Sequence, residues 1–284
     1  MTRPSTRHLV LGFCILAAFA RVFWPTWVWM AERFDAHDSF YSHGWLIPIA
    51  SAWLIWQRRA QLATISKHPS FWGLALLVPS LAVHTAATWW HVGFVSGLAM
   101  LGAIWGFIWT FWGWSVLRAL RFPMLFLLFM VPLPGILLIA ISFKMKLMAA
   151  TLATALLKVI GIAAVHAGST IHVRGLSVIV DDTCSGLRSL ISLIALATLW
   201  TAVVPASAKR WKKLAIVASS IPISLLANMV RIVVLVLLSA IYGPQIADSF
   251  IHYGSGLVVF GVALMALTWL TKMFIGPSRT LARV

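Results

Sequence analysis

The chain has 284 residues, of which 61% are hydrophobic and only 10% are charged. A soluble domain carries about a quarter charged residues, so this composition excludes a soluble enzyme and a soluble binding module. The formal net charge of +16 does not favour a nucleic-acid-binding protein, because the basic residues are scattered between apolar runs. The class that remains is a polytopic membrane protein, which we expect to be a single all-α transmembrane domain over residues 1–284.

Apolar runs of about the 20 residues that a helix needs to cross a bilayer recur along the whole chain. We expect eight transmembrane spans, at residues 9–29, 41–57, 70–88, 94–114, 122–134, 186–204, 214–241 and 255–273. The second and fifth are short, and the fifth ends at the break Pro132-Leu133-Pro134-Gly135.

The longest extramembrane segment covers residues 135–183. Its first part, 135–160, is apolar and helix-like, and we expect it either to lie in the outer membrane interface or to form a re-entrant element. Residues 169–180 predict a short β-hairpin, with its turn at Arg174-Gly175.

Basic residues determine the expected orientation, because cytoplasmic loops are enriched in Lys and Arg. Fourteen basic residues fall on one side of the eight spans: Arg3, Arg7, Arg58, Arg59, Lys67, Arg118, Arg121, Lys209, Arg210, Lys212, Lys213, Lys272, Arg279 and Arg283. All six acidic residues fall on the other side: Glu32, Asp35, Asp38, Asp181, Asp182 and Asp248. We therefore expect a protein of the cytoplasmic (inner) membrane with both termini in the cytoplasm.

Three chemically reactive side chains are expected on the outer face. Cys184 precedes the sixth span, Arg231 lies in the outer half of the seventh, and His252 lies just before the eighth. A thiolate can attack an amide carbonyl to form a thioester, and a histidine can protonate the departing amine and later deprotonate an acceptor. An arginine can hold the oxyanion, since it stays charged throughout.

The surroundings of Cys184 favour this chemistry in part. Ser185 and Gly186 are expected to place the cysteine at a helix N-terminus, whose free N–H groups stabilise a thiolate. Asp182 opposes that effect, so a cation is needed. Arg188 is four residues from Cys184, which would put both on one helical face, and Arg231 is the other candidate.

Structural interpretations of the same residues stay open. A lone cysteine in a membrane helix is most often a small packing residue, as we expect for Cys14. Arg231 lies in an apolar run, where an arginine faces the bundle or a polar cavity and can simply form a buried ion pair. His37, His43, His91, His166 and His172 are also expected outside, but none has the spacing of a tight metal-ligand pair. No metal or other cofactor is expected.

Taken together, four stretches resemble the exosortases, membrane-embedded cysteine transpeptidases related to the archaeosortases. They are YSHGWLIPIASAWLIW from Tyr41, RFPMLFLLFMVPLP from Arg121, DDTCSGLRSL around Cys184, and NMVRI with the later HYGSG. The resemblance covers roughly residues 38–260 in order and spacing. It implies that Cys184, Arg231 and His252 are catalytic. We also expect Arg188, Ser185, Asn228 and His43 to have supporting roles.

The resemblance also implies a function. Substrates would be secreted proteins that end in a short PEP-CTERM-like motif, a transmembrane segment and a basic tail. Cleavage would release the tail and transfer the protein to an acceptor, which would be an amine, a lipid or a glycan. The other expected partner is membrane lipid, and no nucleic acid is expected. Two rivals remain: a non-proteolytic component of exopolysaccharide export or assembly, and a transporter that pairs Arg231 with Asp182.

Overall fold

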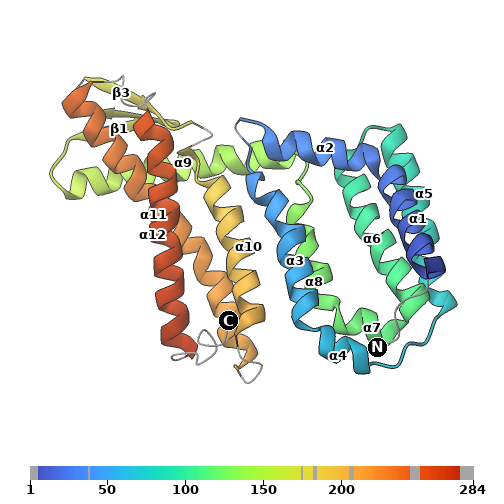
Figure 1. Cartoon of the computed structure of the whole chain (residues 1–284). Helices are drawn as coiled ribbons and strands as arrows, with labels where there is room; N and C mark the ends of the chain where they lie inside the picture. The colour runs from blue at the N-terminus through green and yellow to red at the C-terminus, as the bar shows by residue number, and fades with distance from the viewer. Residues whose placement is uncertain are drawn as a thin grey trace. The chain divides into compact units, whose positions relative to one another are not determined.

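The computed structural model describes residues 6–37, 39–173, 175–181, 184–204, 208–243 and 250–275. They are mostly helical, with one small sheet, and form two compact units (Figure 1). Unit 1 comprises Met1–His37 and Ser42–Pro132, and unit 2 comprises Asp38–Tyr41 and Leu133–Val284. The expected all-α membrane architecture is confirmed at this level, whereas the expected single domain stays a prediction.

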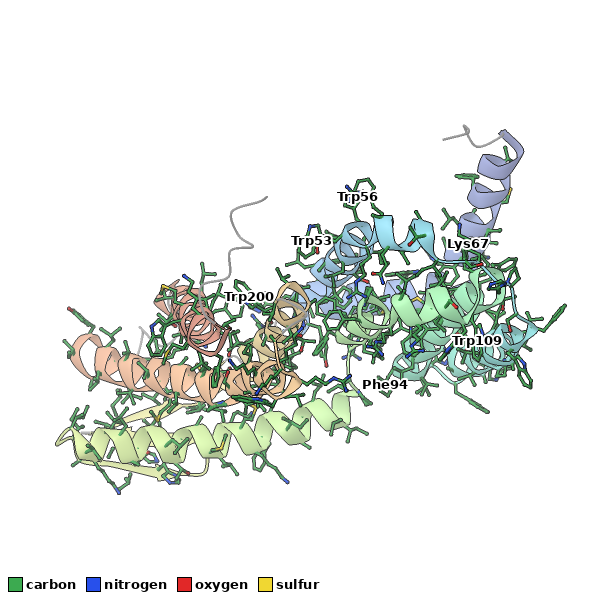
Figure 2. The ribbon with its side chains drawn as sticks, turned by 90° about the horizontal axis from the view of Figure 1, so that it is seen from below. Trp53, Trp56, Lys67, Phe94, Trp109 and Trp200 are labelled. Atoms are coloured by element: carbon green, nitrogen blue, oxygen red, sulfur yellow. The ribbon has the colours of Figure 1, made fainter. Side chains whose placement is uncertain are left out.

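Unit 1 is entirely helical in the part that the structure describes. Its elements are α1 (Thr6–Val22), α2 (Trp24–Asp35), η1 (Ser42–Trp45), α3 (Leu46–Gln57), α4 (Arg59–Thr64), η2 (Phe71–Gly73), α5 (Leu74–Trp89), α6 (Gly93–Trp112), α7 (Trp114–Ala119), α8 (Arg121–Phe126) and η3 (Leu127–Met130). Large apolar side chains cover its outer surface, as on a lipid-facing helix. Trp53 and Trp56 project outward from α3 (Figure 2).

Glycines let α5 and α6 approach closely. Gly102 and Gly106 are four residues apart on α6, so they lie on the same face of the helix. A Cβ on Gly106 would lie 2.6 Å from the backbone nitrogen of Leu77, and one on Gly102 would lie 2.5 Å from Oγ of Ser80. Small residues at this spacing allow membrane helices to pack backbone against backbone.

The first expected span, residues 9–29, is not one straight helix. α1 and α2 meet at Phe23 and are bent by 64°. Pro25 lies in the first turn of α2, where its missing N–H and its ring interrupt a continuous helix. The sequence prediction overlooked this consequence of Pro25.

A buried histidine completes the bend. His84 Nε2 lies 3.0 Å from the Val22 carbonyl oxygen, and since a carbonyl only accepts, this nitrogen carries the proton. Nδ1 then accepts from Ser96 Oγ at 2.8 Å, and Thr26 Oγ1 lies 2.6 Å from Ser96 Oγ. The histidine therefore satisfies a carbonyl at the end of α1, a structural role that the sequence prediction missed.

Unit 2 combines four helices with a sheet. Its elements are α9 (Gly135–Val159), β1 (Ala164–Ala167), β2 (Thr170–Val173), β3 (Leu176–Ile179), α10 (Leu187–Val203), α11 (Arg210–Tyr242) and α12 (Phe250–Ile275). α11 is the central helix, because it packs against α9, α10 and α12.

The sheet is antiparallel, in the order β1-β2-β3. The β2–β3 pair confirms the predicted hairpin, with Thr170 opposite Ile179 and Val173 opposite Leu176. β1 was not predicted; it pairs with β2 through a tight turn in which Gly168 has a φ of +60°. Ile171 and Val173 of β2 point into the core of the unit.

Five described helical segments are long and apolar enough to cross a membrane, or six if the bent pair counts as one span. The expected count of eight spans is not confirmed, because α3 has only 12 residues and the apolar helices at residues 121–130 and 187–203 are also short. α9 has the length and composition of a span, yet it runs across α10 and α12 rather than along them (Figures 1 and 2).

Candidate active site

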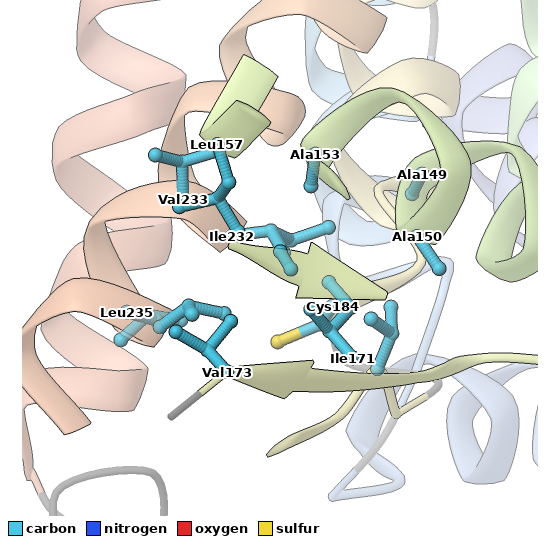
Figure 3. Close-up of a cluster of buried hydrophobic side chains, with 13 residues drawn as sticks. Ala149, Ala150, Ala153, Leu157, Ile171, Val173, Cys184, Ile232, Val233 and Leu235 are labelled. Carbon is cyan, nitrogen blue, oxygen red and sulfur yellow. The ribbon is translucent and has the colours of Figure 1, made fainter. Parts of the chain in front are cut away.

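Cys184 lies in a turn between β3 and α10. Its backbone N–H donates to the Asp181 carbonyl at 3.0 Å, and its side chain is only 5% exposed. The sulfur points into an apolar cluster (Figure 3). The cluster is made by α9, the sheet and α11: Ala149, Ala150, Ala153, Leu157, Ala164, Ile171, Val173, Val180, Ile232, Val233, Leu235 and Val236.

The residues after Cys184 form the start of α10. Gly186 has a φ of +78° and precedes the first helical residue, Leu187. Ser185 Oγ accepts a hydrogen bond from the Leu187 N–H at 3.3 Å, so this serine satisfies one N–H of the first turn, while Gly186 is the N-cap residue. Cys184 therefore lies just before a helix N-terminus, as the sequence suggested.

The expected relation between Cys184 and Arg188 is wrong. Two residues four positions apart share a face only when both lie in one continuous helix, and Cys184 lies outside α10. The left-handed conformation of Gly186 turns the chain between the two residues. Arg188 is half-buried on the first turn of α10.

Asn228 of α11 holds the cysteine segment in place. Its Nδ2 donates to the Cys184 carbonyl at 2.8 Å, and the side chain is buried. The two segments approach so closely that a Cβ on Gly186 would lie 2.8 Å from Cγ of Asn228. Glycine is thus required at position 186 for its positive φ and also for space.

Arg231 lies three residues after Asn228 and is also buried, at 8% exposure. Its Nε donates to Ser255 Oγ of α12 at 3.0 Å, and Gly256 of α12 lies beside the guanidinium group. The NMVRI and HYGSG stretches therefore meet where α11 packs on α12.

These contacts belong to a polar stripe on the buried face of α11. Ser220, Ser224, Asn228 and Arg231 follow one another at intervals of four, four and three residues, and all are buried. Ser224 Oγ lies 3.3 Å from Ser189 Oγ of α10. The stripe has helical periodicity, so the sequence alone contained the signal that Ser224 accompanies Asn228 and Arg231.

The remaining residues that the sequence singled out are His252, His43 and Asp182. His252 lies in the first turn of α12, one turn before Ser255, and its side chain is outside the described set. His43 lies in η1 of unit 1 and is half-buried. Asp182, the expected partner of Arg231 in a transporter, lies outside the described residues.

The structure gives no support to a histidine metal site. Among the described residues, no three His, Cys, Asp or Glu side chains come together. His166 pairs with Ile171 and His172 pairs with Val165, so the two histidines lie on opposite faces of the sheet. His172 Nδ1 instead lies 2.8 Å from Ser177 Oγ.

Fold and site together define a multi-pass helical membrane protein with a buried cysteine and a buried arginine on neighbouring elements of one unit. The family model for transmembrane exosortases (Exosortase_EpsH) matches residues 29–269. The chain therefore belongs to the transmembrane exosortase family, and the matched region contains every predicted site residue. Comparisons with curated proteins and with solved structures gave no match.

Proposed function

We propose that this exosortase is a thiol peptidase and transpeptidase that removes a C-terminal sorting signal from secreted proteins. The observation that carries the proposal is the joining of the motif segments in unit 2. Asn228 holds the backbone of Cys184, and Arg231, on the same face of α11, binds Ser255 of α12. Residues that serve packing alone would not need this buried polar connection between three segments.

In the proposed reaction, Cys184 attacks the carbonyl carbon of the scissile peptide bond. The C–S bond forms and the carbonyl electrons move to the oxygen, where the guanidinium of Arg231 stabilises the negative charge. The hydrogen bond from Nε to Ser255 fixes the plane of that guanidinium. His252 takes the thiol proton and passes it to the amine as the C–N bond breaks.

The second half of the reaction releases the protein from the enzyme. An acceptor amine, hydroxyl or water loses a proton to His252 and attacks the thioester carbonyl. The new bond forms, the C–S bond breaks, and the thiolate of Cys184 is restored. Because the thiol is buried among apolar side chains, a substrate must displace some of them before it reacts, which limits wasteful hydrolysis.

We also propose that the site faces the outer side of the inner membrane. In unit 1, Arg58 donates to the Ala119 carbonyl at 2.6 Å at the end formed by α4 and α7, while Glu32 and Asp35 lie on α2 at the opposite end (Figure 1). In unit 2, Lys212 donates to the Phe274 carbonyl at one end, and Cys184 precedes the other end of α10. Each unit thus has a basic end opposite the acidic residues or Cys184, which the positive-inside rule assigns to the cytoplasm, and Lys144, Lys146 and Lys158 of α9 lie outside this pattern.

The test compares Cys184→Ala with Cys14→Ala, a cysteine exposed on α1. Immunoblots would follow a tagged substrate with a sorting tail at matched enzyme levels. Cys184→Ala should leave the substrate full-length in the membrane, and Cys14→Ala should process it normally. Normal processing by Cys184→Ala would exclude the thiol mechanism and favour a non-proteolytic assembly role.

A further inference from the structure

The outer edge of β3 is a row of main-chain groups that turn away from the sheet. The Val180 N–H donates to the Ser169 carbonyl at 3.0 Å, in the same register that pairs Val178 with Ile171. Hydrogen-bonded pairs alternate along an antiparallel ladder. Leu176 and Val178 therefore bond to β2 and Val180 bonds to Ser169 just before it, whereas the N–H and C=O groups of Ser177 and Ile179 point outward.

β3 is less covered than the other edge strand. β1 and β2 both pack against α9, whereas the main neighbour of β3 among the described elements is β2. Ile179 is 63% exposed, and Ser177 is exposed too. An exposed edge is a template for pairing with another extended chain.

The edge runs directly toward the proposed nucleophile. Ile179 precedes Cys184 by five positions, and the Cys184 N–H donates to the Asp181 carbonyl in the connecting segment. Val178 and Val180, on the inner face of β3, pack in or against the same apolar cluster as Cys184. A chain paired with this edge would extend that inner face beside the cysteine.

We infer that the outer edge of β3, the N–H and C=O groups of Ser177 and Ile179, binds the sorting motif of the substrate as an added β-strand. This inference rests on the proposed function and specifies how the substrate is bound. A peptide must be extended to expose its scissile bond, and strand addition gives affinity through the main chain with little demand on sequence. Alternate side chains of the motif face the apolar cluster, which supplies the specificity.

The test removes one outward N–H without touching the ladder. Ile179→Pro deletes this donor, and proline is tolerated on an edge strand where its nitrogen faces outward. His166→Pro is the matched control, because its N–H points outward from the opposite edge, at β1. We expect Ile179→Pro to lower substrate processing about tenfold, as for the loss of one hydrogen bond. Ile179→Val and His166→Pro should stay within about twofold of the parent.

A second measurement tests the same inference without the proline variant, in case Ile179→Pro fails to fold. A photo-crosslinking amino acid is placed at position 177 of β3 or at position 165 of β1, both in a Cys184→Ala background that retains uncleaved substrate. Crosslinks to the sorting motif from position 177 but not from 165 support strand addition. Absence of the position 177 crosslink, or normal processing by Ile179→Pro, overturns it.

The two proposals fail separately. If Cys184→Ala abolishes processing and Ile179→Pro does not impair it, the thiol peptidase stands and the β3 inference is wrong. If Cys184→Ala processes substrate normally, the thiol peptidase is wrong whatever β3 binds.

Discussion

The backbone conformation of Gly186 helps to position the proposed nucleophile, Cys184. Its positive φ lets the chain turn from Cys184 into α10, and its missing side chain leaves room for Asn228. Asn228 in turn holds the Cys184 carbonyl. A side chain at position 186 would disturb all three residues together.

We predict that Gly186→Ala is more damaging than Gly175→Ala. Gly175 has a similar φ of +82° but no atom within 4 Å of an added Cβ, so it reports strain alone, about 1 kcal/mol. At Gly186, displacement of Asn228 also leaves the Cys184 carbonyl without its donor, for a total of about 2–4 kcal/mol. Thermal unfolding in detergent would measure both variants. Equal losses would mean that the contact with Asn228 has no energetic role.

Arg231 allows a separate test of charge against geometry. Lysine keeps the charge, but it has no planar group to bind Ser255 and an oxyanion together. We predict that Arg231→Lys inserts normally and loses about a hundredfold or more in processing rate. Arg188→Lys, assayed in parallel at matched levels, should retain most activity. The reverse result would transfer the cationic role to Arg188.

At the scale of the elements, the bend between α1 and α2 depends on a residue far away in the sequence. His84 of α5 donates to the Val22 carbonyl and accepts from Ser96. His84 and Ser96 are buried, so each needs a hydrogen-bond partner. The bend is therefore held by α5 and α6 as well as by Pro25.

We predict that His84→Leu destabilises unit 1 by about 1–3 kcal/mol, because it leaves the Val22 carbonyl without its donor and removes one of the two hydrogen-bond partners of the Ser96 hydroxyl. Thr85→Val is the control: Thr85 is exposed and bonds only its own helix, to the Leu81 carbonyl, so it should shift stability by less than about 0.5 kcal/mol. Loss of folded protein on size-exclusion chromatography and a lower melting temperature would measure the difference. Equal behaviour of the two variants would contradict the structural role of His84.

For the whole molecule, orientation is the property to test, and Cys184 is a poor reporter because it is buried. In a chain without native cysteines, Val165→Cys on β1 and Ser66→Cys after α4 are both exposed. We predict that a membrane-impermeant thiol reagent labels Val165→Cys in intact spheroplasts. Ser66→Cys should be labelled only in inverted vesicles. The opposite pattern would reverse the orientation of the protein.

Much of the fold follows from properties that a sequence carries locally. Long apolar runs predicted α5, α6, α11 and α12, because the hydrophobic length needed to cross a bilayer is a property of one segment. The β2–β3 hairpin was predicted for the same reason, since its turn and its strands are adjacent in the chain. The order of the DDTCSGLRSL, NMVRI and HYGSG stretches was also enough to suggest the family.

The tertiary structure decided which of these residues meet. That Asn228 binds the Cys184 carbonyl, that Arg231 binds Ser255, and that Gly186 removes Arg188 from the helical face of Cys184 are contacts between separate segments. The burial of the thiol in the apolar cluster formed by α9, the sheet and α11 also depends on separate segments. Sequence periodicity describes one helix at a time, whereas these contacts depend on how helices pack and on a single left-handed residue between them.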